Sequence, residues 1–463
     1  MTSGDRGIRG VDSAADDFVA RRRGQASAPA AADRPGWRPT RALSRAFVVI
    51  AVASALGVLL GRVDLVILAL PFIIGTAVAL RSRPTALPTV TLQLGTDVGA
   101  EGGDVHARMR VANPGEVPLS TAVLRAGVSP WVRLRQGHGT YAASVGAEMG
   151  NSIVVAGRAM RWGAHFFGPV LADTYACDNL FHYETLPAEA KRVRTYPVGE
   201  PFSADEAMPR ASGLGGTHRS RRPGEGGELA GVRPYQPGDR LRRIDWRVSM
   251  RARELYVNHT LSDRDAEVVL LLDVGVDAGT SGGVDGKASV LDTAVRATAA
   301  IAEHYLHRGD RVSCLEFGPR VRRLRPGTGR RHYLSTLEWL LGVRVADGVS
   351  SDTRLLRSGA LPPNALVVML TPLLDDSSLS ALAGLARAGR FLVAVDTLPE
   401  HVRPEHDGVW SAHAERLWRL DRENAIGELR EHGVPVVRWG GAGSLDQVLR
   451  DVTRMSASGK AMI

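Results

Sequence analysis

The sequence has very little cysteine. Only Cys177 and Cys314 occur in 463 residues, and they lie far apart. This excludes a disulfide-rich scaffold and leaves no zinc-binding spacing. Two free thiols favour a reducing compartment.

The common catalytic and nucleotide-binding motifs are also missing. The chain contains no His-Glu-x-x-His, no Gly-x-Ser-x-Gly and no Gly-Lys-Ser/Thr. The thirteen histidines are scattered, and isolated ones such as His165, His182 and His304 are typical of ordinary surface or core positions. We therefore predict no catalytic residue and no enzyme.

The length and charge leave several classes of protein open. A chain of 463 residues is long enough for two or three domains. The formal charge is +9, carried mostly by arginine. Such a balance favours nucleic acid, anionic lipid or an acidic partner, and arginine also serves structural ion pairs.

Two uncharged runs follow a polar start. Residues 1–42 are rich in Ala, Gly, Pro, Arg and Asp, which predicts a disordered tail. The runs Ala46–Gly61 and Leu65–Leu80 are each about 16 residues, or about 24 Å as helices, against a hydrocarbon core of about 30 Å. We predict a transmembrane hairpin over residues 43–83, with a buried or re-entrant helix pair as the alternative.

The charged residues around the runs predict their orientation. Arginines precede the first run and follow the second, whereas the connecting turn carries one Arg and one Asp. The positive-inside tendency therefore predicts a chain with two membrane spans, with both termini and the main body in the cytoplasm. The flanking arginines are Arg38, Arg41, Arg45, Arg81 and Arg83.

Residues 84–200 predict a small all-β sandwich. Short segments of β character recur, broken by Gly, Pro and Asn, as in an antiparallel sandwich. They are Val90–Leu94, Val105–Val111, Val123–Ala126, Trp131–Arg135 and Ser152–Val155. The next region, residues 201–262, reads as a linker that is rich in Gly and Arg and ends in an unusual stretch.

That stretch has a turn signal inside a run of arginines. Gln236-Pro237-Gly238-Asp239 is typical of a turn, and Ile244-Asp245-Trp246-Arg247 follows it. It resembles the signature of a bacterial family, domain of unknown function 58, whose pattern is roughly Y-x-P-G-D-x-x-R-x-I-D-W-x-x-x-A-R. The matching positions are Tyr235, Pro237, Gly238, Asp239, Arg242, Ile244, Asp245, Trp246 and Arg251, and Met250 departs from the pattern.

The resemblance implies an architecture and a partner. Members of this family look like membrane-attached proteins with a von Willebrand factor A-like domain, often paired with a MoxR-type AAA+ ATPase. No reaction is established for them as a class. The resemblance therefore implies a MoxR-type ATPase partner and membrane lipid around the hairpin.

Residues 263–458 alternate strand and helix patterns, which predicts a doubly wound α/β domain. Val268–Leu272 is a continuous apolar run, typical of a buried parallel strand, and ends in Asp273. Further strands are expected at Arg311–Phe317, Ala365–Leu370, Phe391–Asp396 and Val434–Arg438. Helices are expected at Ser289–His307, Tyr333–Leu341, Ser377–Ala388, Leu417–Glu431 and Leu445–Met455. The whole fold is thus mixed: a helical hairpin, a β-sandwich and a von Willebrand factor A-like domain.

The resemblance also suggests residues that could hold a metal ion. Von Willebrand factor A domains commonly hold Mg²⁺ with Asp-x-Ser-x-Ser after the first strand, and here this motif reads Asp273-Val274-Gly275-Val276-Asp277. Thr371 stands where a later Asp is expected, and Thr328 is a candidate middle ligand. We regard the motif as degraded and expect no cofactor. Mg²⁺ on Asp273, Asp277 and Thr328 is the alternative to a structural Asp273.

Two interpretations of the signature stay open. Its arginines, with Arg247 and Arg251 among them, could face an acidic partner or lipid. Alternatively, Asp239 and Asp245 hold arginines in place, with Trp246 packed over a guanidinium between domains. We expect a membrane-anchored scaffold. The alternatives are a divalent-metal hydrolase on Asp273 and Asp277, or a nucleic-acid binder, which we do not expect because only Tyr235 and Trp246 are aromatic there.

Overall fold

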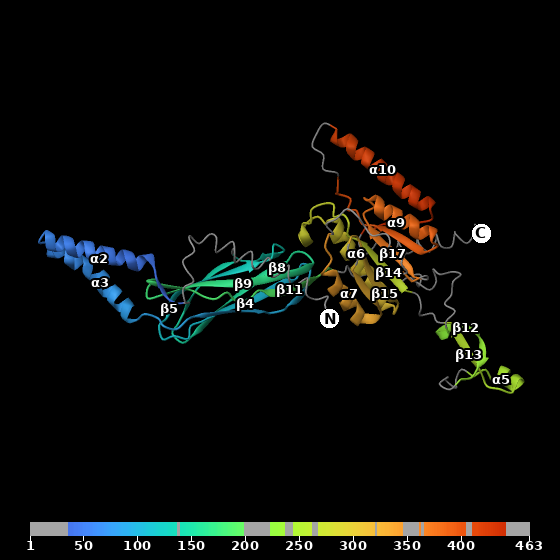
Figure 1. Cartoon of the computed structure of the whole chain (residues 1–463), viewed down its shortest axis with the longest axis horizontal. Helices are drawn as coiled ribbons and strands as arrows, with labels where there is room; N and C mark the ends of the chain where they lie inside the picture. Colours follow the sequence, from blue (N-terminus) through green and yellow to red (C-terminus); the bar gives the residue numbers. More distant parts are fainter. Residues whose placement is uncertain are drawn as a thin grey trace. The chain divides into compact units, whose positions relative to one another are not determined.

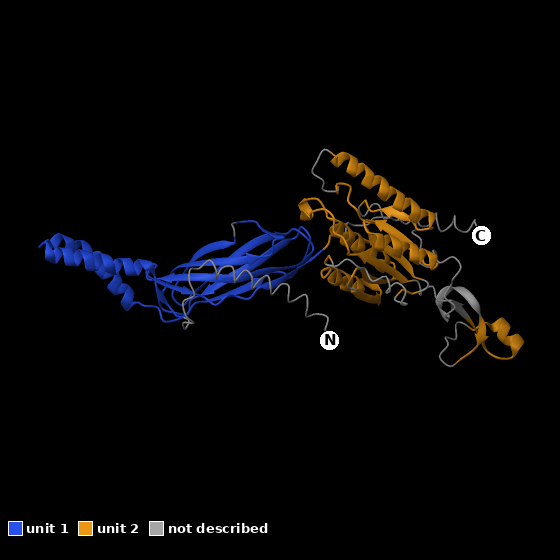
Figure 2. Ribbon diagram, turned by 45° about the horizontal axis from the view of Figure 1, so that its top comes forward, with its two compact units in different colours: residues 1–196 blue, residues 197–463 orange. Residues whose placement is uncertain are grey.

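The computed structural model divides the chain into two compact units, residues 1–196 and 197–463 (Figure 2). The described residues are 36–136, 139–198, 223–236, 244–261, 267–319, 322–345, 361–362, 365–403 and 410–440. The predicted helix at Leu445–Met455 and most of the predicted tail lie outside them.

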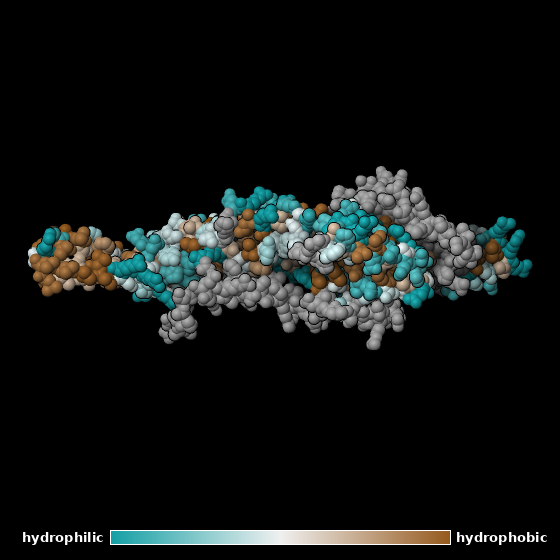
Figure 3. Space-filling model, turned by 90° about the horizontal axis from the view of Figure 1, so that it is seen from above, coloured by the Kyte–Doolittle hydropathy of each residue, from teal (hydrophilic) through white to brown (hydrophobic). Residues whose placement is uncertain are grey.

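The first unit begins with two antiparallel apolar helices, α2 (Arg41–Leu59) and α3 (Val63–Arg81) (Figure 1). Both are long and apolar enough to cross a membrane, and only 11% and 17% of their most apolar windows are buried. Figure 3 shows their hydrophobic surface in brown. A buried soluble hairpin would cover these side chains, so the exposure argues against that alternative.

Glycine lets the two helices approach each other. A Cβ added at Gly57 of α2 would lie 2.7 Å from Cγ2 of Val66 in α3. Small residues at such a contact are typical of helix pairs in membranes. The short connection carries an ion pair between Arg62 and Asp64 at 2.7 Å. The pair neutralises both charges of the predicted turn.

The disordered tail predicted for residues 1–42 is too long, because residues 36–42 belong to the folded first unit. Arg38 and Pro39 form strand β1, and Trp37 is only 6% exposed in the sandwich core. The indole Nε1 of Trp37 donates to the carbonyl of Ala86 at 2.9 Å. The polar composition of residues 1–42 did not indicate this contact, because one buried tryptophan contributes as much apolar area as several smaller residues.

The predicted β-sandwich is present, with two sheets around one core. The smaller sheet has the order β2-β4-β8-β6, and the larger holds β1, β10, β9, β11, β3, β5 and β7. The core includes Met109, Leu124 and Phe167, each at most 1% exposed. The remaining bounds are β2 Thr89–Leu94, β3 Val98–Ala100, β4 Asp104–Ala112, β5 Leu119–Val128, β6 Val132–Leu134, β7 Thr140–Val145, β8 Gly150–Ala159, β9 Gly163–Ala176, β10 Phe181–Glu184 and β11 Lys191–Tyr196.

In the second unit, part of the expected linker is a strand. β12 (Pro223–Pro234) pairs antiparallel with β13 (Tyr256–Leu261), with register shifts near its glycines. Between them lies the short helix α5 (Trp246–Ala252). We call β12, α5 and β13 with their described connections the ribbon module. The glycines that suggested a linker are accommodated as irregularities in the ladder.

The rest of the second unit is the predicted doubly wound sheet. Its order is β16-β15-β14-β17-β18-β19, with all pairs parallel except β15 with β16. All seven residues of β14 are buried, as the continuous apolar run predicts. The bounds are β14 Glu267–Asp273, β15 Arg311–Phe317, β16 Arg323–Gly327, β17 Leu366–Thr371, β18 Phe391–Asp396 and β19 Val436–Arg438.

Helices connect these strands, as expected. α6 (Val290–His307) begins at Ser289, whose side chain forms a capping box with Asp292, and Gly309 follows its end with φ +85°. α7 (Gly329–Leu340) packs on α6, and α9 (Asp376–Arg387) contacts α10 (Ser411–Glu431). α6 lies on one face of the sheet, and α9 with α10 lies on the other (Figure 1).

Candidate functional site

The short helix of the signature begins at a defined cap. Asp245 has extended backbone angles, and its Oδ1 accepts hydrogen bonds from the N–H groups of Arg247 and Val248, both at 3.1 Å. These bonds satisfy donors that have no partner inside the helix. Arg253 ends the helix in the left-handed conformation, with φ 56°. The carboxylate of Asp245 is therefore the N-cap of α5.

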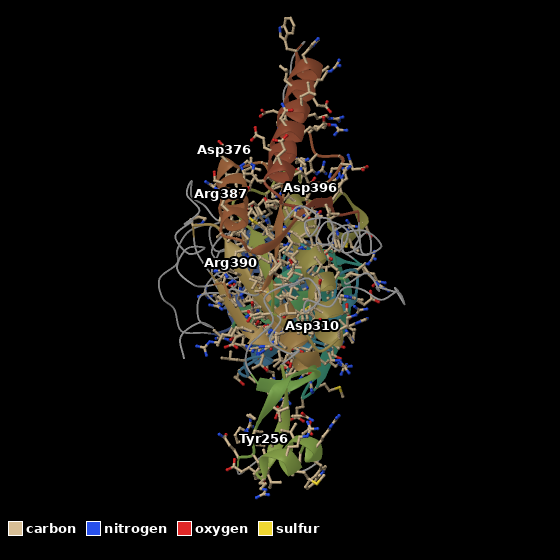
Figure 4. All side chains as sticks on the ribbon, turned by 90° about the vertical axis from the view of Figure 1, so that its right-hand side faces the viewer. Tyr256, Asp310, Asp376, Arg387, Arg390 and Asp396 are labelled. Atoms are coloured by element: carbon tan, nitrogen blue, oxygen red, sulfur yellow. The ribbon has the colours of Figure 1, made fainter. Side chains whose placement is uncertain are left out.

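Strand β13 holds the helix in place. The hydroxyl of Ser249 donates to the carbonyl of Asp245 at 2.7 Å and accepts from the N–H of Tyr256 at 2.9 Å. Ile244 forms a bridge with Val257, and both side chains are buried. Figure 4 shows Tyr256 within this module. Because these contacts are short and buried, α5 has a fixed orientation on the ribbon.

The outer face of α5 carries the apolar and cationic side chains. Trp246 is 63% exposed and Met250 is 78% exposed, one helical turn apart. Arg247, Arg251 and Arg253 are exposed beside them, and within the described residues none of the three forms an ion pair. Trp246 is thus mostly exposed within its own module. The interpretation that it packs over a guanidinium between domains stays a prediction, because Arg242 and its neighbours lie outside the described residues. The inward side of the helix is occupied by Ser249, so Trp246 is left on the outside.

The signature is only partly described. The backbone N–H of Tyr235 donates to the carbonyl of Leu255 at 2.8 Å, which extends the ladder of β12 and β13 at the end of the ribbon that carries α5. Four predicted site residues lie outside the described residues: Pro237, Gly238, Asp239 and Arg242. The structure therefore brings together Tyr235, Asp245, Trp246, Arg247 and Arg251 on one module.

A second cluster of polar side chains lies at the carboxyl edge of the sheet, at the ends of the neighbouring strands β14 and β17. The hydroxyl of Thr371 donates to Oδ2 of Asp273 at 2.7 Å, and the N–H of Gly275 donates to Oδ1 at 3.0 Å. Burial raises the pKa of Asp273 above its usual value; the hydrogen bonds from Thr371 and Gly275 oppose the rise. Doubly wound sheets bind ligands at this kind of switch point.

The other predicted metal ligands do not join Asp273. Oδ1 of Asp277 accepts from the N–H of Leu291 at 2.9 Å and so caps the start of α6. Thr328 follows Gly327, which pairs with Val312 near the start of β15, whereas Asp273 pairs with Phe317 at its end. Five residues of strand span roughly 16 Å. Thr328 is therefore at the opposite edge, and its prediction as a ligand is wrong.

The alternative interpretation of Asp273 is a cation site. Ser378 and Asp375 are near enough to influence its pKa, and both lie at the start of α9. Within the part of the chain that the structure describes, no cluster of three or more His, Cys, Asp or Glu side chains gathers. Both oxygens of Asp273 are already hydrogen-bonded. With both oxygens accepting hydrogen bonds from Thr371 and Gly275, the donor set fits a structural carboxylate.

One ion pair at the end of β18 was not predicted from the sequence. Asp396 ends β18 and lies beside Thr371 of β17. Its Oδ1 accepts from Nη2 of Arg422 in α10 at 2.6 Å. Figure 4 shows Asp396 beside α10. An Asp at the end of a predicted buried strand was a visible signal, but its arginine partner is 26 residues away and on a helix.

Comparison with known proteins gives distant relatives. An uncharacterized protein of Mycobacterium tuberculosis is 36% identical over 143 residues, which is 30% of this chain and 44% of that protein. An uncharacterized protein of Mycobacterium bovis matches over the same shares. The chain thus spans less than half the length of the curated relatives it matches.

Solved structures resemble only a part of the chain. A cohesin module from Clostridium perfringens is 14% identical, covers 25% of this chain and all of its own, and has a TM-score of 0.18. The CARDB domain of a Pyrococcus furiosus protein is 13% identical, covers 24% of this chain and 93% of its own, and has a TM-score of 0.17. The sandwich is accordingly assigned from its own strand pairing.

The family comparison covers most of the ribbon module and much of the doubly wound sheet. The match extends over residues 231–401, which include the described signature residues and Asp273. Residues 231–401 of this chain therefore form a domain of the family described as "Protein of unknown function DUF58".

Proposed function

We propose that this chain is a membrane-anchored scaffold that docks an acidic protein partner through the outer face of α5. The observation that carries the proposal is the exposure of Trp246 and Met250 beside three arginines without ion pairs among the described residues. Tryptophan, methionine and arginine are enriched at the centres of protein interfaces. The cationic side chains match a partner of negative surface charge.

The hairpin supplies the anchor. α2 and α3 have the length and apolar surface of membrane spans, and the first unit holds their base through the buried Trp37. The flanking arginines favour a cytoplasmic location for both termini and the body. An anchor held by the sandwich keeps the sandwich at the membrane surface.

The partner that the family resemblance favours is a MoxR-type AAA+ ATPase. Its pairing with this chain rests on the resemblance alone, and so does the von Willebrand factor A-like name for the doubly wound sheet. In this proposal the chain contributes binding rather than chemistry. Support comes from Asp273 and Asp277, which are occupied by structural hydrogen bonds.

Crosslinking in intact membranes tests the proposal. The full-length chain and the variants Trp246→Ala and Trp410→Ala would be crosslinked, purified and searched for AAA+ ATPases. Trp410 is a matched control, because it is 74% exposed but lies at the start of α10. We expect the ATPase with the wild type and with W410A, and its loss with W246A. Equal recovery with W246A, or no ATPase with any chain, would overturn the proposal.

A further inference from the structure

A pocket of about 450 Å³ lies between α10 and the carboxyl ends of β18 and β19. Asp396 and Arg422 are its least exposed charged residues, with side chains 8% and 15% exposed. Leu398, Val402 and Ile426 are among its apolar lining residues, with Trp418 beside them. Pockets of this size, with apolar walls and a few converging polar groups, are typical of small-molecule sites.

The charges of this pocket do not balance. Five guanidinium groups line it, and together with Glu415, which bonds two of them, four carboxylates are present. The arginines are Arg403, Arg419, Arg422, Arg430 and Arg438, and the acids are Asp396, Glu400, Glu415 and Glu423. The pocket therefore carries an excess of one positive charge.

Two of the guanidinium groups have donors to spare. Arg422 uses Nη2 for the carboxylate of Asp396 and for the carbonyl of Pro372, while its buried Nε has no acceptor. The side chain of Arg430 makes one recorded hydrogen bond, a long one of 3.4 Å to the carbonyl of Val436. The buried Nε of Arg422 is unfavourable without an acceptor, so an oxyanion in this pocket would supply what the protein leaves unmet. Arg430 is exposed and contributes its charge.

We propose that this pocket binds a small monocarboxylate carried on an apolar group. One carboxylate offsets the single excess charge, and its planar pair of oxygens suits guanidinium donors. The apolar part of the ligand lies against Trp418, Val402 and Ile426. The pocket lies beside the carboxyl end of β18, away from the switch point between β14 and β17.

The site is separate from the face of α5. Arg422 connects the pocket to the body of the sheet through Asp396, which lies beside Thr371 in the neighbouring strand. A ligand here would contact α10 and the loop after β18 at once. Binding therefore stabilises the packing of α10 against the sheet without requiring the docked partner.

Titration calorimetry with the full-length chain in lipid nanodiscs tests the proposal, with benzoate as the probe. Benzyl alcohol supplies the apolar group without the charge, and inorganic phosphate supplies charge without the apolar group. Both should bind at least about tenfold more weakly than benzoate, because each lacks one half of the recognition. No heat with benzoate at 20 mM, or equal affinity for phosphate, would overturn the proposal.

Three variants assign binding to this pocket. Arg430→Gln should weaken benzoate by about tenfold, since it removes a charged donor. Glu423→Gln should strengthen it, because Glu423 is an exposed lining carboxylate that repels the ligand. Arg416→Gln is the control, as Arg416 is exposed on α10 and does not line the pocket. The same change with R416Q and R430Q, or no response to E423Q, would contradict this location.

Discussion

The hydroxyl of Thr371 donates a hydrogen bond to the carboxylate of Asp273, with 2.7 Å between the two oxygens. The two residues end neighbouring strands β14 and β17, and they are 98 positions apart in sequence. Both are buried, at 5% and 0% exposure. The bond joins the two halves of the doubly wound sheet at its switch point.

This environment predicts how stability depends on pH. Burial raises the pKa of Asp273, so the unfolded chain releases its proton at a lower pH than the folded chain does. The stability from this group is full below the ordinary aspartate pKa and is lost as pH rises through the raised value. Asp273→Asn cannot ionise, so the melting temperature of the wild type relative to D273N should fall as the pH rises above the ordinary aspartate pKa.

Melting curves at several pH values, with and without Mg²⁺, check this expectation. Thr328→Ala is the control, because Thr328 lies at the opposite edge of the sheet and should follow the wild type. A wild-type advantage that grows with pH would contradict the expectation. Stabilisation by Mg²⁺ that is lost only in D273N would restore the metal hypothesis.

The exposed position of Trp246 predicts a small effect on folding. Trp246→Ala should change the free energy of unfolding by less than about 0.5 kcal/mol, as exposed positions usually do. Trp339→Ala should cost about 3–5 kcal/mol, because Trp339 is 8% exposed and stacks with Arg322 at 4.5 Å. Denaturant unfolding monitored by circular dichroism measures both. Similar losses would show that Trp246 is a core residue.

The cap at Asp245 predicts a local effect. Asp245→Ala removes the acceptor for two backbone N–H groups and should destabilise α5 by about 1 kcal/mol. Asp245→Asn should retain most of the stability, since asparagine is an equally good cap. Hydrogen exchange at the amide of Val248 reports the difference. If D245A and D245N exchange at the same rate, the cap does not hold the helix.

The two cysteines should differ in reactivity. Burial raises the pKa of Cys314 to about 12, and its side chain has no exposed surface. Cys177 is half-buried, and burial raises its pKa as well, but its surface is reachable. A maleimide should therefore label the folded chain at Cys177, and both cysteines after denaturation. Labelling of the folded Cys177→Ser variant at the wild-type rate would contradict this assignment.

The buried Trp37 predicts coupling between the hairpin and the sandwich. Trp37→Ala should cost about 3–5 kcal/mol of sandwich stability, since it leaves a cavity. Trp37→Phe should cost less, about 1 kcal/mol, because it removes the hydrogen bond to Ala86 and keeps most of the ring. Unfolding of the detergent-solubilised chain measures both. Wild-type stability in W37A would place residues 36–42 outside the sandwich.

The sequence predicted those elements whose signal is local. The two apolar runs became α2 and α3, the run at Val268–Leu272 became a fully buried strand, and Ser289 with Asp292 started a helix. Apolar runs, helix caps and turn residues depend on positions only a few residues apart, so the sequence alone indicates them. The signature also pointed to the family of residues 231–401.

What only the tertiary structure decided is which distant residues meet. Trp37 is buried because β1 pairs with β10, and Trp246 is exposed because Ser249 and Ile244 occupy the inner side of its helix. Asp273 meets Thr371, and Thr328 does not, because strand register sets which edge each residue reaches. The sequence determines the periodicity of each segment. The burial of a side chain and its hydrogen-bond partners follow from the packing between segments, because the partners come from distant parts of the chain.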